Sequence, residues 1–147
     1  MIKISKAKPK ESQSIRQFEQ LVWNETDITS PYDIVSFVTY GYVFLAEDTE
    51  KDKDKIVGTI VAIKTKDNEI RIVDWIVHEQ YRHTGIGTRL YKRLRKEIGN
   101  LTMIAYVESD NTASIEGHKK LGFKPTKKVK DPFFIGEKKN WLVMKSK

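Results

Sequence analysis

The sequence predicts an α/β domain with a mixed, mostly antiparallel, twisted sheet flanked by about four helices. Residues 70–77 form a β-branched and aromatic run typical of a buried strand. Apolar residues recur every four positions through 86–98, as on one face of a helix. The strand-like segments 42–46 and 56–63 flank a charged tract, which indicates an antiparallel hairpin.

The elements before this hairpin can be assigned in chain order. Residues 2–7 predict a first strand, and apolar residues three to four positions apart predict a helix over about 10–23. A second helix is expected over 31–40. Ser30 can cap it, a proline suits its first turn, and Gly41 ends it.

The elements after the hairpin complete one domain over residues 1–147. We expect the tract Asp48–Lys55 inside the hairpin to be a solvated loop. The later elements are a turn at 66–68, a strand over 101–107, a helix over 111–121 and closing strands over 124–129 and 140–145.

The composition excludes several classes of site. The chain of 147 residues has no cysteine, which rules out disulfides, thiolate metal sites and a cysteine nucleophile. Its three histidines show no metal-ligand spacing, so no metal site is expected. No apolar stretch is long enough to span a membrane and the N-terminal residues lack an apolar signal core, which favours a cytoplasmic protein.

The net charge of +7 comes mostly from lysines spread along the chain, with a denser share from Lys119 to Lys139. A nucleic-acid reader more often carries arginines with interleaved aromatic residues. The pattern therefore favours a solvated surface over a nucleic-acid interface. A positive rim would still steer a polyanionic ligand towards the protein.

The segment Arg82–Gly87 lies between the strand 70–77 and the helix 86–98 and predicts an anion site. Backbone N–H groups at a helix start lack partners, and the helix dipole favours negative charge there. Gly85 and Gly87 would let a phosphate approach the backbone. The segment is not a complete dinucleotide-binding fingerprint, because Leu90 occupies its third glycine position. It is not a Walker loop either, since the sequence G-x-x-x-x-G-K-[ST] does not occur in the chain.

Two segments resemble the GNAT superfamily of N-acyltransferases. The pattern Val77-x-x-x-Tyr81-Arg82-x-x-Gly85-Ile86-Gly87 is similar to its acyl-CoA signature. Asn111 to Phe123 resembles the family's N-x-x-A-x-x-x-Y-x-x-x-G-F segment, with Ser114 in place of the alanine and His118 in place of the tyrosine. The resemblance is tight over residues 70–123 and implies a GNAT-like fold.

The resemblance also implies how acetyl-CoA would bind as co-substrate. Backbone N–H groups would line the pyrophosphate, and they belong to His83, Thr84, Gly85, Ile86, Gly87 and Thr88. Arg82 would fix this turn or pair with the pyrophosphate. The backbone of Trp75, Ile76 and Val77 would pair with the pantetheine arm, and the Val77 N–H would support the thioester carbonyl. Asn111 would contact the arm or simply cap its helix.

Three carboxylates are candidates for the base that neutralises an attacking amine. Asp74 interrupts an apolar strand, and such a carboxylate must face solvent, a partner or a cleft. In the family an acidic residue at or beside this point handles the amine. Glu108 follows at the end of the next predicted strand, where helix capping also explains its surroundings. Glu47 ranks third.

His118 stands where the family carries a tyrosine that protonates the departing thiolate. A protonated imidazole can do this, since its unperturbed pKa is near 6.5. The alternative is that His118 packs on its helix and the thiolate leaves to solvent.

The predicted function is N-acetyl transfer from acetyl-CoA to a primary amine by direct attack in a ternary complex. The acceptor stays open between a small amine and a protein amine. Aromatic residues are candidate walls of its site, or core: Trp23, Tyr40, Tyr42, Trp75, Phe133 and Phe134. Two other readings are a regulatory or degenerate CoA-binding GNAT-like domain and a basic nucleic-acid-binding protein. A homodimer is left open.

Overall fold

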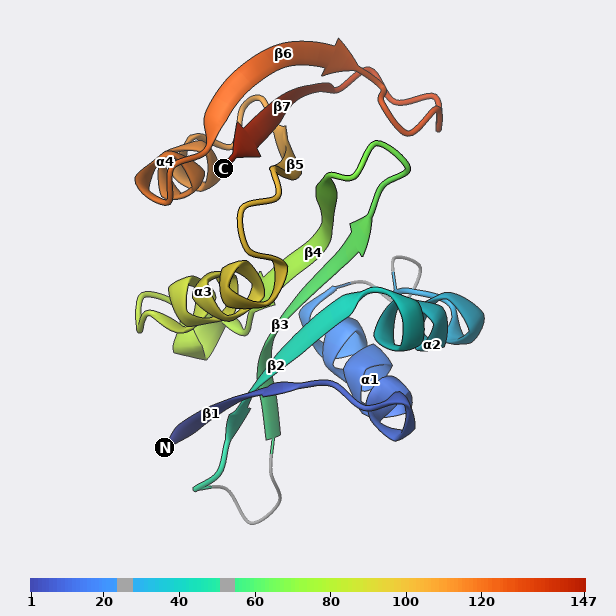
Figure 1. Cartoon of the computed structure of the whole chain (residues 1–147), viewed down its shortest axis with the longest axis vertical. Coiled ribbons are helices and arrows are strands. Elements are labelled where there is room, and N and C mark those ends of the chain that lie inside the picture. Colours follow the sequence, from blue (N-terminus) through green and yellow to red (C-terminus); the bar gives the residue numbers. More distant parts are fainter. Residues whose placement is uncertain (24–27, 51–54) are drawn as a thin grey trace. The chain divides into compact units, whose positions relative to one another are not determined.

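The computed structural model describes residues 1–23, 28–50 and 55–147 (Figure 1). Within these residues it contains seven strands and four α-helices, as the sequence predicts. The elements in chain order are β1 (Ile2–Lys6), η1 (Pro9–Glu11), α1 (Ser12–Val22), α2 (Pro31–Tyr40), β2 (Tyr42–Asp48), β3 (Lys55–Lys64), β4 (Ile70–Val77), η3 (Glu79–Tyr81), α3 (Ile86–Ile98), β5 (Met103–Glu108), α4 (Thr112–Lys120), β6 (Lys124–Lys130) and β7 (Asn140–Ser146).

The described strands form one sheet in the order β1-β2-β3-β4-β5-β7-β6. β1 pairs with β2, β2 with β3, β5 with β7 and β6 with β7, all antiparallel. β4 and β5 are parallel, with Ile70 opposite Met103 and Arg71 opposite Ile104. The prediction of a mixed, mostly antiparallel sheet is confirmed.

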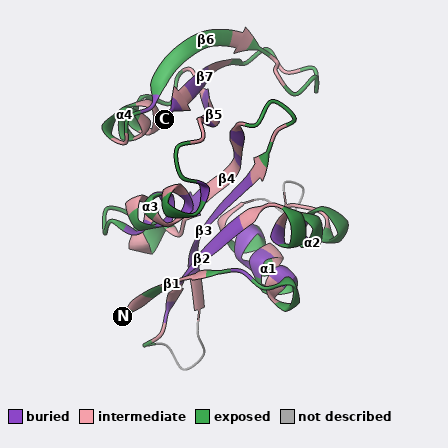
Figure 2. Cartoon of the chain, viewed as in Figure 1, coloured by how far each residue is buried: buried purple, intermediate pink, exposed green. Residues whose placement is uncertain are grey.

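The chain divides into two units, of which the first comprises residues 1–63 and 73–99. Its strands are covered on both faces. Val43 and Leu45 of β2 belong to a buried apolar cluster with residues of α1 and α2. Phe44 between them faces the other way, because side chains alternate along a strand, and the Arg93 guanidinium of α3 lies 4.7 Å from its ring centroid. Figure 2 shows burial concentrated along these strands.

The helix boundaries of the first unit follow the predicted signals, with one difference. Ser30 Oγ accepts a hydrogen bond from the Asp33 amide at 3.1 Å, and α2 ends before Gly41 as expected. The first helix begins at Ser12 rather than near residue 10. A 3-10 turn precedes it, in which the Glu11 carboxylate accepts from the Lys8 amide at 2.8 Å.

The expected solvated loop over Asp48–Lys55 needs a correction at both ends. Asp48 is the last residue of β2 and is buried, while Lys55 is the first residue of β3. A charged side chain is rarely buried without partners, and the Asp48 carboxylate has the Tyr81 hydroxyl, the Glu50 amide and the Met1 α-ammonium. Residues 51–54 of the same tract lie outside the described residues.

The second unit comprises residues 64–72 and 100–147. Met103, Ala105 and Val107 alternate along β5 and are buried. Phe123, which follows α4, is 1% exposed, so it belongs to the core as expected. β6 is the outermost strand of the sheet and carries exposed lysines along most of its length.

Candidate functional site

The turn before α3 has a conformation that suits an anion site. Gly85, immediately before the helix, has φ +84° and lies in the left-handed region that favours glycine. His83 is also left-handed, with φ +63°. No side chain of the described residues caps the helix start, so its first amides have no capping partner. Residues 82–85 are exposed, whereas Ile86 is buried and anchors the helix.

The two glycines of the turn have different surroundings. A Cβ on Gly85 would meet no atom of the described residues within 4 Å, so on their side the space in front of the turn is open to a ligand. A Cβ on Gly87 would point at β4, 3.6 Å from Trp75 Nε1 and 3.6 Å from Val77 Cγ2. A side chain at this position would therefore face the strand, and whether Gly87 brings a phosphate close to the backbone stays a prediction.

Hydrogen bonds within the first unit hold the turn. Arg82 Nε donates to the carbonyl oxygen of Val77 at 3.2 Å, and Thr84 Oγ1 donates to that of Tyr81. Of the two roles expected for Arg82, this contact supports fixing the turn. These bonds connect the end of β4, η3 and the turn into one local structure.

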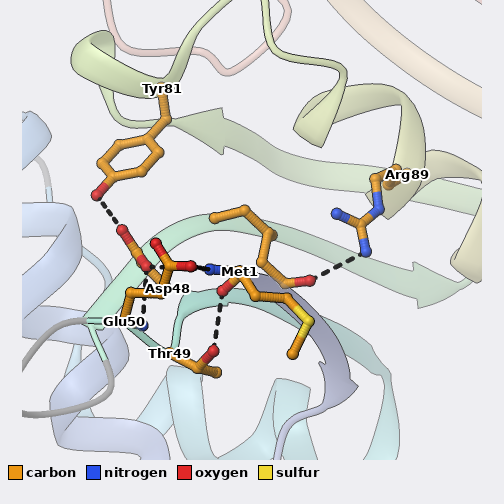
Figure 3. Close-up of polar contacts among 7 residues, drawn as sticks. Met1, Asp48, Thr49, Glu50, Tyr81 and Arg89 are labelled. Carbon is orange, nitrogen blue, oxygen red and sulfur yellow. Dashed lines mark hydrogen bonds and ion pairs between the residues drawn. The ribbon is translucent and has the colours of Figure 1, made fainter.

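Tyr81 connects the turn to β2, as Figure 3 shows. Its hydroxyl donates to Asp48 Oδ2 at 2.6 Å, and Asp48 Oδ1 accepts from the Glu50 amide at 3.1 Å. The α-ammonium of Met1 lies 3.8 Å from Asp48 Oδ1 and 3.0 Å from Glu50 Oε1. The hydrogen bond to Asp48 raises the pKa of Tyr81 above its ordinary value, so the phenol stays a donor.

Trp75 and Asp74 lie at an irregular point of β4. Val73 packs against the cluster of α1 and α2, but Trp75 faces α3: its ring stacks on that of Tyr91 at 5.8 Å between centroids. Residues two apart in a regular strand share a face. The alternation therefore changes between Val73 and Trp75, at Asp74, which is half-buried.

Glu108 and Asn111 lie in the second unit, and both have structural partners. Glu108 Oε1 is 3.4 Å from Lys139 Nζ. Asn111 Oδ1 accepts from the Ser114 amide at 3.1 Å and so caps α4, as one of its two predicted roles requires.

His118 lies on α4, half-buried against Phe123, with 5.2 Å between the ring centroids. Its Nδ1–H donates to the carbonyl oxygen of Ser114 at 2.7 Å. Burial lowers the pKa of His118 below 6.5, and the Ser114 carbonyl opposes that shift in part. The imidazole is therefore mostly neutral at pH 7.

The family model for the acetyltransferase (GNAT) family matches residues 12–123, which is most of the chain. The chain belongs to the GNAT acetyltransferase family. No curated protein sequence matches it closely enough to count as a relative.

Solved structures share the fold of this GNAT protein at low identity. The ribosomal-protein-S18-alanine N-acetyltransferase of Escherichia coli is 19% identical over 99% of this chain and 93% of that chain, with a TM-score of 0.80. Arabidopsis thaliana NAA60, solved with a bisubstrate analogue, is 14% identical over 99% of this chain and 97% of that chain, with a TM-score of 0.82. Ard1 from Thermoplasma volcanium is 23% identical over 98% of this chain and 95% of that chain, with a TM-score of 0.78.

The predicted site residues of this GNAT protein fall into two groups. Asp74, Trp75, Ile76, Val77 and the turn 82–88 belong to the first unit. Glu108, Asn111 and His118 belong to the second. Glu47, the third carboxylate candidate, lies on β2 in the first unit, where Ser5 Oγ donates to its Oε1 at 3.5 Å. The catalytic and cofactor-binding roles of all these residues stay predictions.

The candidate acceptor walls differ in their surroundings. Tyr40 is 87% and Phe134 92% exposed, so neither is core. Phe133 contacts Trp141 and Tyr106, with centroid distances of 5.1 and 5.6 Å. Trp75 is committed to α3, since its indole Nε1 donates to the Gly87 carbonyl oxygen at 3.1 Å.

Sequence reasoning missed two features of this GNAT protein. One is the Asp48–Tyr81 contact, because the two residues are 33 positions apart and Asp48 sits in a charged run. The other is Arg71, whose guanidinium lies 4.8 Å from the Tyr106 ring centroid and 5.7 Å from that of Phe133. Among the described residues, no three metal-binding side chains gather, and no helix is long and apolar enough to cross a membrane.

Proposed function

We propose that this protein is an N-acetyltransferase that moves an acetyl group from acetyl-CoA to a primary amine. The observation that carries the proposal is the start of α3, where amides uncapped by any described side chain follow a left-handed, exposed turn. Family membership supports the reaction class. Low identity to solved enzymes leaves the acceptor open between a small amine and a protein amine.

The start of α3 fits the diphosphate of the donor. Backbone N–H groups from His83 through Thr88 would donate to it, and the positive end of the helix dipole favours its charge. The open space beside Gly85 gives the ligand room. Backbone groups of Trp75, Ile76 and Val77 would pair with the amides of the pantetheine arm.

The acceptor amine must be neutral before it can attack the thioester. Deprotonating a lysine-like amine at pH 7 costs roughly 4–5 kcal/mol, so a base is useful. Asp74 is the first choice, because it lies half-buried beside the strand residues assigned to the donor. Glu108 is second, since it already pairs with Lys139.

The transfer needs no covalent enzyme intermediate. The amine nitrogen attacks the thioester carbonyl, a C–N bond forms, the C–S bond breaks, and the amine's second proton passes to the base. The Val77 N–H would donate to the carbonyl oxygen as its charge grows. The leaving thiolate takes a proton from His118 or from water.

The state of His118 decides between these two proton sources. Only the imidazolium can protonate a thiolate, and burial disfavours it at pH 7. Water is therefore the main proton source at neutral pH, and His118 contributes as the pH falls towards its pKa.

The uncapped start of α3 also supports a second candidate function, a regulatory or degenerate domain that binds CoA without transfer. A neutral histidine where the family motif has a tyrosine is compatible with it. Binding of acetyl-CoA without thiol release from any amine would select this alternative.

The test is thiol release from acetyl-CoA across a panel of small amines and peptides. Gly85→Glu puts a carboxylate at the anion site and should abolish turnover. Gly85→Ala is its matched control, because it carries the same left-handed strain without charge. Equal activity of wild type and Gly85→Glu would contradict the proposal, and so would no binding of acetyl-CoA by the wild type.

A further inference from the structure

The turn assigned to the diphosphate is not held in place by burial. Residues 82–85 are all exposed, and two of them adopt left-handed conformations. A left-handed non-glycine residue such as His83 is disfavoured unless its surroundings fix it. The conformation therefore depends on hydrogen bonds from neighbouring residues.

Most of those bonds are local, and Tyr81 adds a long-range one. Thr84 Oγ1 donates to the Tyr81 carbonyl oxygen, and the Tyr81 amide donates to that of His78 at 2.8 Å. Both come from residues within three positions in the chain. The Tyr81 hydroxyl reaches Asp48, 33 residues away at the end of β2.

The Asp48 carboxylate is held in a fixed position by burial and by its other partners. It is 7% exposed, and the Glu50 amide and the Met1 α-ammonium also face its carboxylate (Figure 3). A hydrogen bond to a buried, charged acceptor is stronger than one between neutral groups. The carboxylate is thus a fixed point of the sheet to which the turn is tied.

We propose that Tyr81, held by Asp48, is a positioning residue for the donor diphosphate. The hydroxyl–carboxylate bond keeps the amides of 83–88 in their ligand-binding arrangement before the ligand arrives, so less ordering is needed on binding. Neither residue touches the reacting atoms in this scheme. The inference rests on the proposed function.

The variant that tests it is Tyr81→Phe, which keeps the ring and removes the hydroxyl. Asp48 keeps the Glu50 amide and the Met1 ammonium as partners, so no buried charge loses all its partners. Tyr32→Phe is the matched control, because Tyr32 is 81% exposed in the same unit. The two variants lose the same atom from different surroundings.

Donor binding and donor use are measured with two donors, acetyl-CoA and S-acetylpantetheine, which lacks the diphosphate. We expect Tyr81→Phe to raise the Kd for acetyl-CoA by about five- to twentyfold. The kcat with saturating acetyl-CoA and the kcat/KM with S-acetylpantetheine should stay within about twofold of wild type. Hydrogen exchange of the 83–88 amides should become faster, and Tyr32→Phe should change nothing.

The outcomes separate the inference from the function on which it rests. An unchanged Kd for acetyl-CoA in Tyr81→Phe overturns the inference while the function stands. An equal loss with both donors also overturns it, since the contact would then serve general stability. Failure of the wild type to bind acetyl-CoA overturns the proposed function, and the inference with it.

Discussion

The indole Nε1 of Trp75 donates to the carbonyl oxygen of Gly87 at 3.1 Å and ties β4 to the first turn of α3. The ring also stacks on Tyr91, one turn further along the helix. A Cβ on Gly87 would point towards the same indole, 3.6 Å from its Nε1. One side chain therefore sets the distance between the strand and the helix start proposed to share the donor.

Trp75→Phe should destabilise the protein by about 1–2 kcal/mol, since it removes one hydrogen bond and part of a stacked ring. Urea unfolding followed by circular dichroism measures this. Tyr91→Phe, which keeps the stacked ring, is the comparison and should cost less. Equal stability of Trp75→Phe and wild type would show that the contact contributes nothing.

Ser30→Ala should lower the free energy of unfolding by about 0.5–2 kcal/mol, because the Asp33 amide loses its capping oxygen. Ser14→Ala is the control on an exposed face of α1 and should stay within about 0.5 kcal/mol of wild type. Thermal and urea unfolding provide the measurement. A loss of unfolding free energy no larger than that of Ser14→Ala would show that the Ser30 cap does not stabilise α2.

The stability of the protein should fall as the pH drops from about 7 through 6.5 and below, and His118 should contribute to this fall. Its folded-state pKa is lowered, so below pH 6.5 the unfolded chain binds a proton that the folded chain resists. Its contribution is fully present above 6.5 and is lost between 6.5 and the folded pKa. His118→Gln should flatten this part of the profile, and an identical slope in both proteins would contradict the shift.

His118→Phe should change kcat little at pH 8 and more at pH 6, measured at saturating amine. At pH 8 the imidazole is neutral and cannot donate a proton to the thiolate, whereas at lower pH a growing fraction can. Ser14→Ala, remote in sequence and exposed, serves as the unaffected reference. Identical rates for His118→Phe and wild type across this range would remove His118 from the mechanism.

Replacing Lys127 and Lys128 by valine should make the protein self-associate. β6 is the outer strand of the sheet, and exposed lysines discourage pairing with another edge. Sedimentation over a range of concentrations detects the change. Lys92→Val with Lys96→Val is the control, on an exposed face of α3, and should remain like wild type.

Local sequence signals predicted most of the fold. Ser30 and Gly41 mark the ends of α2 because capping depends on neighbouring residues. The four-residue spacing from Ile86 to Ile98 likewise placed α3, whose buried face it forms. Each signal lies within a few positions of the element that it specifies.

The features that depend on distant partners were not predictable in this way. Asp48 reads as part of a charged loop because its partner Tyr81 is far along the chain. The change of face in β4 at Asp74 depends on where α1, α2 and α3 pack, which alternation along one strand does not reveal. The sequence motif identified the turn 82–88, whereas the contacts that a side chain at Gly87 would make with Trp75 and Val77 depend on how α3 packs on β4.

The turn before α3 has left-handed backbone at His83 and Gly85, and turns of this kind can present several amides to one anion. On the proposed assignment it grips the portion of coenzyme A common to every thioester of that carrier. Selection among acetyl, propionyl and longer donors must therefore arise elsewhere in the protein. Efforts to re-engineer which acyl group is transferred should leave this turn intact.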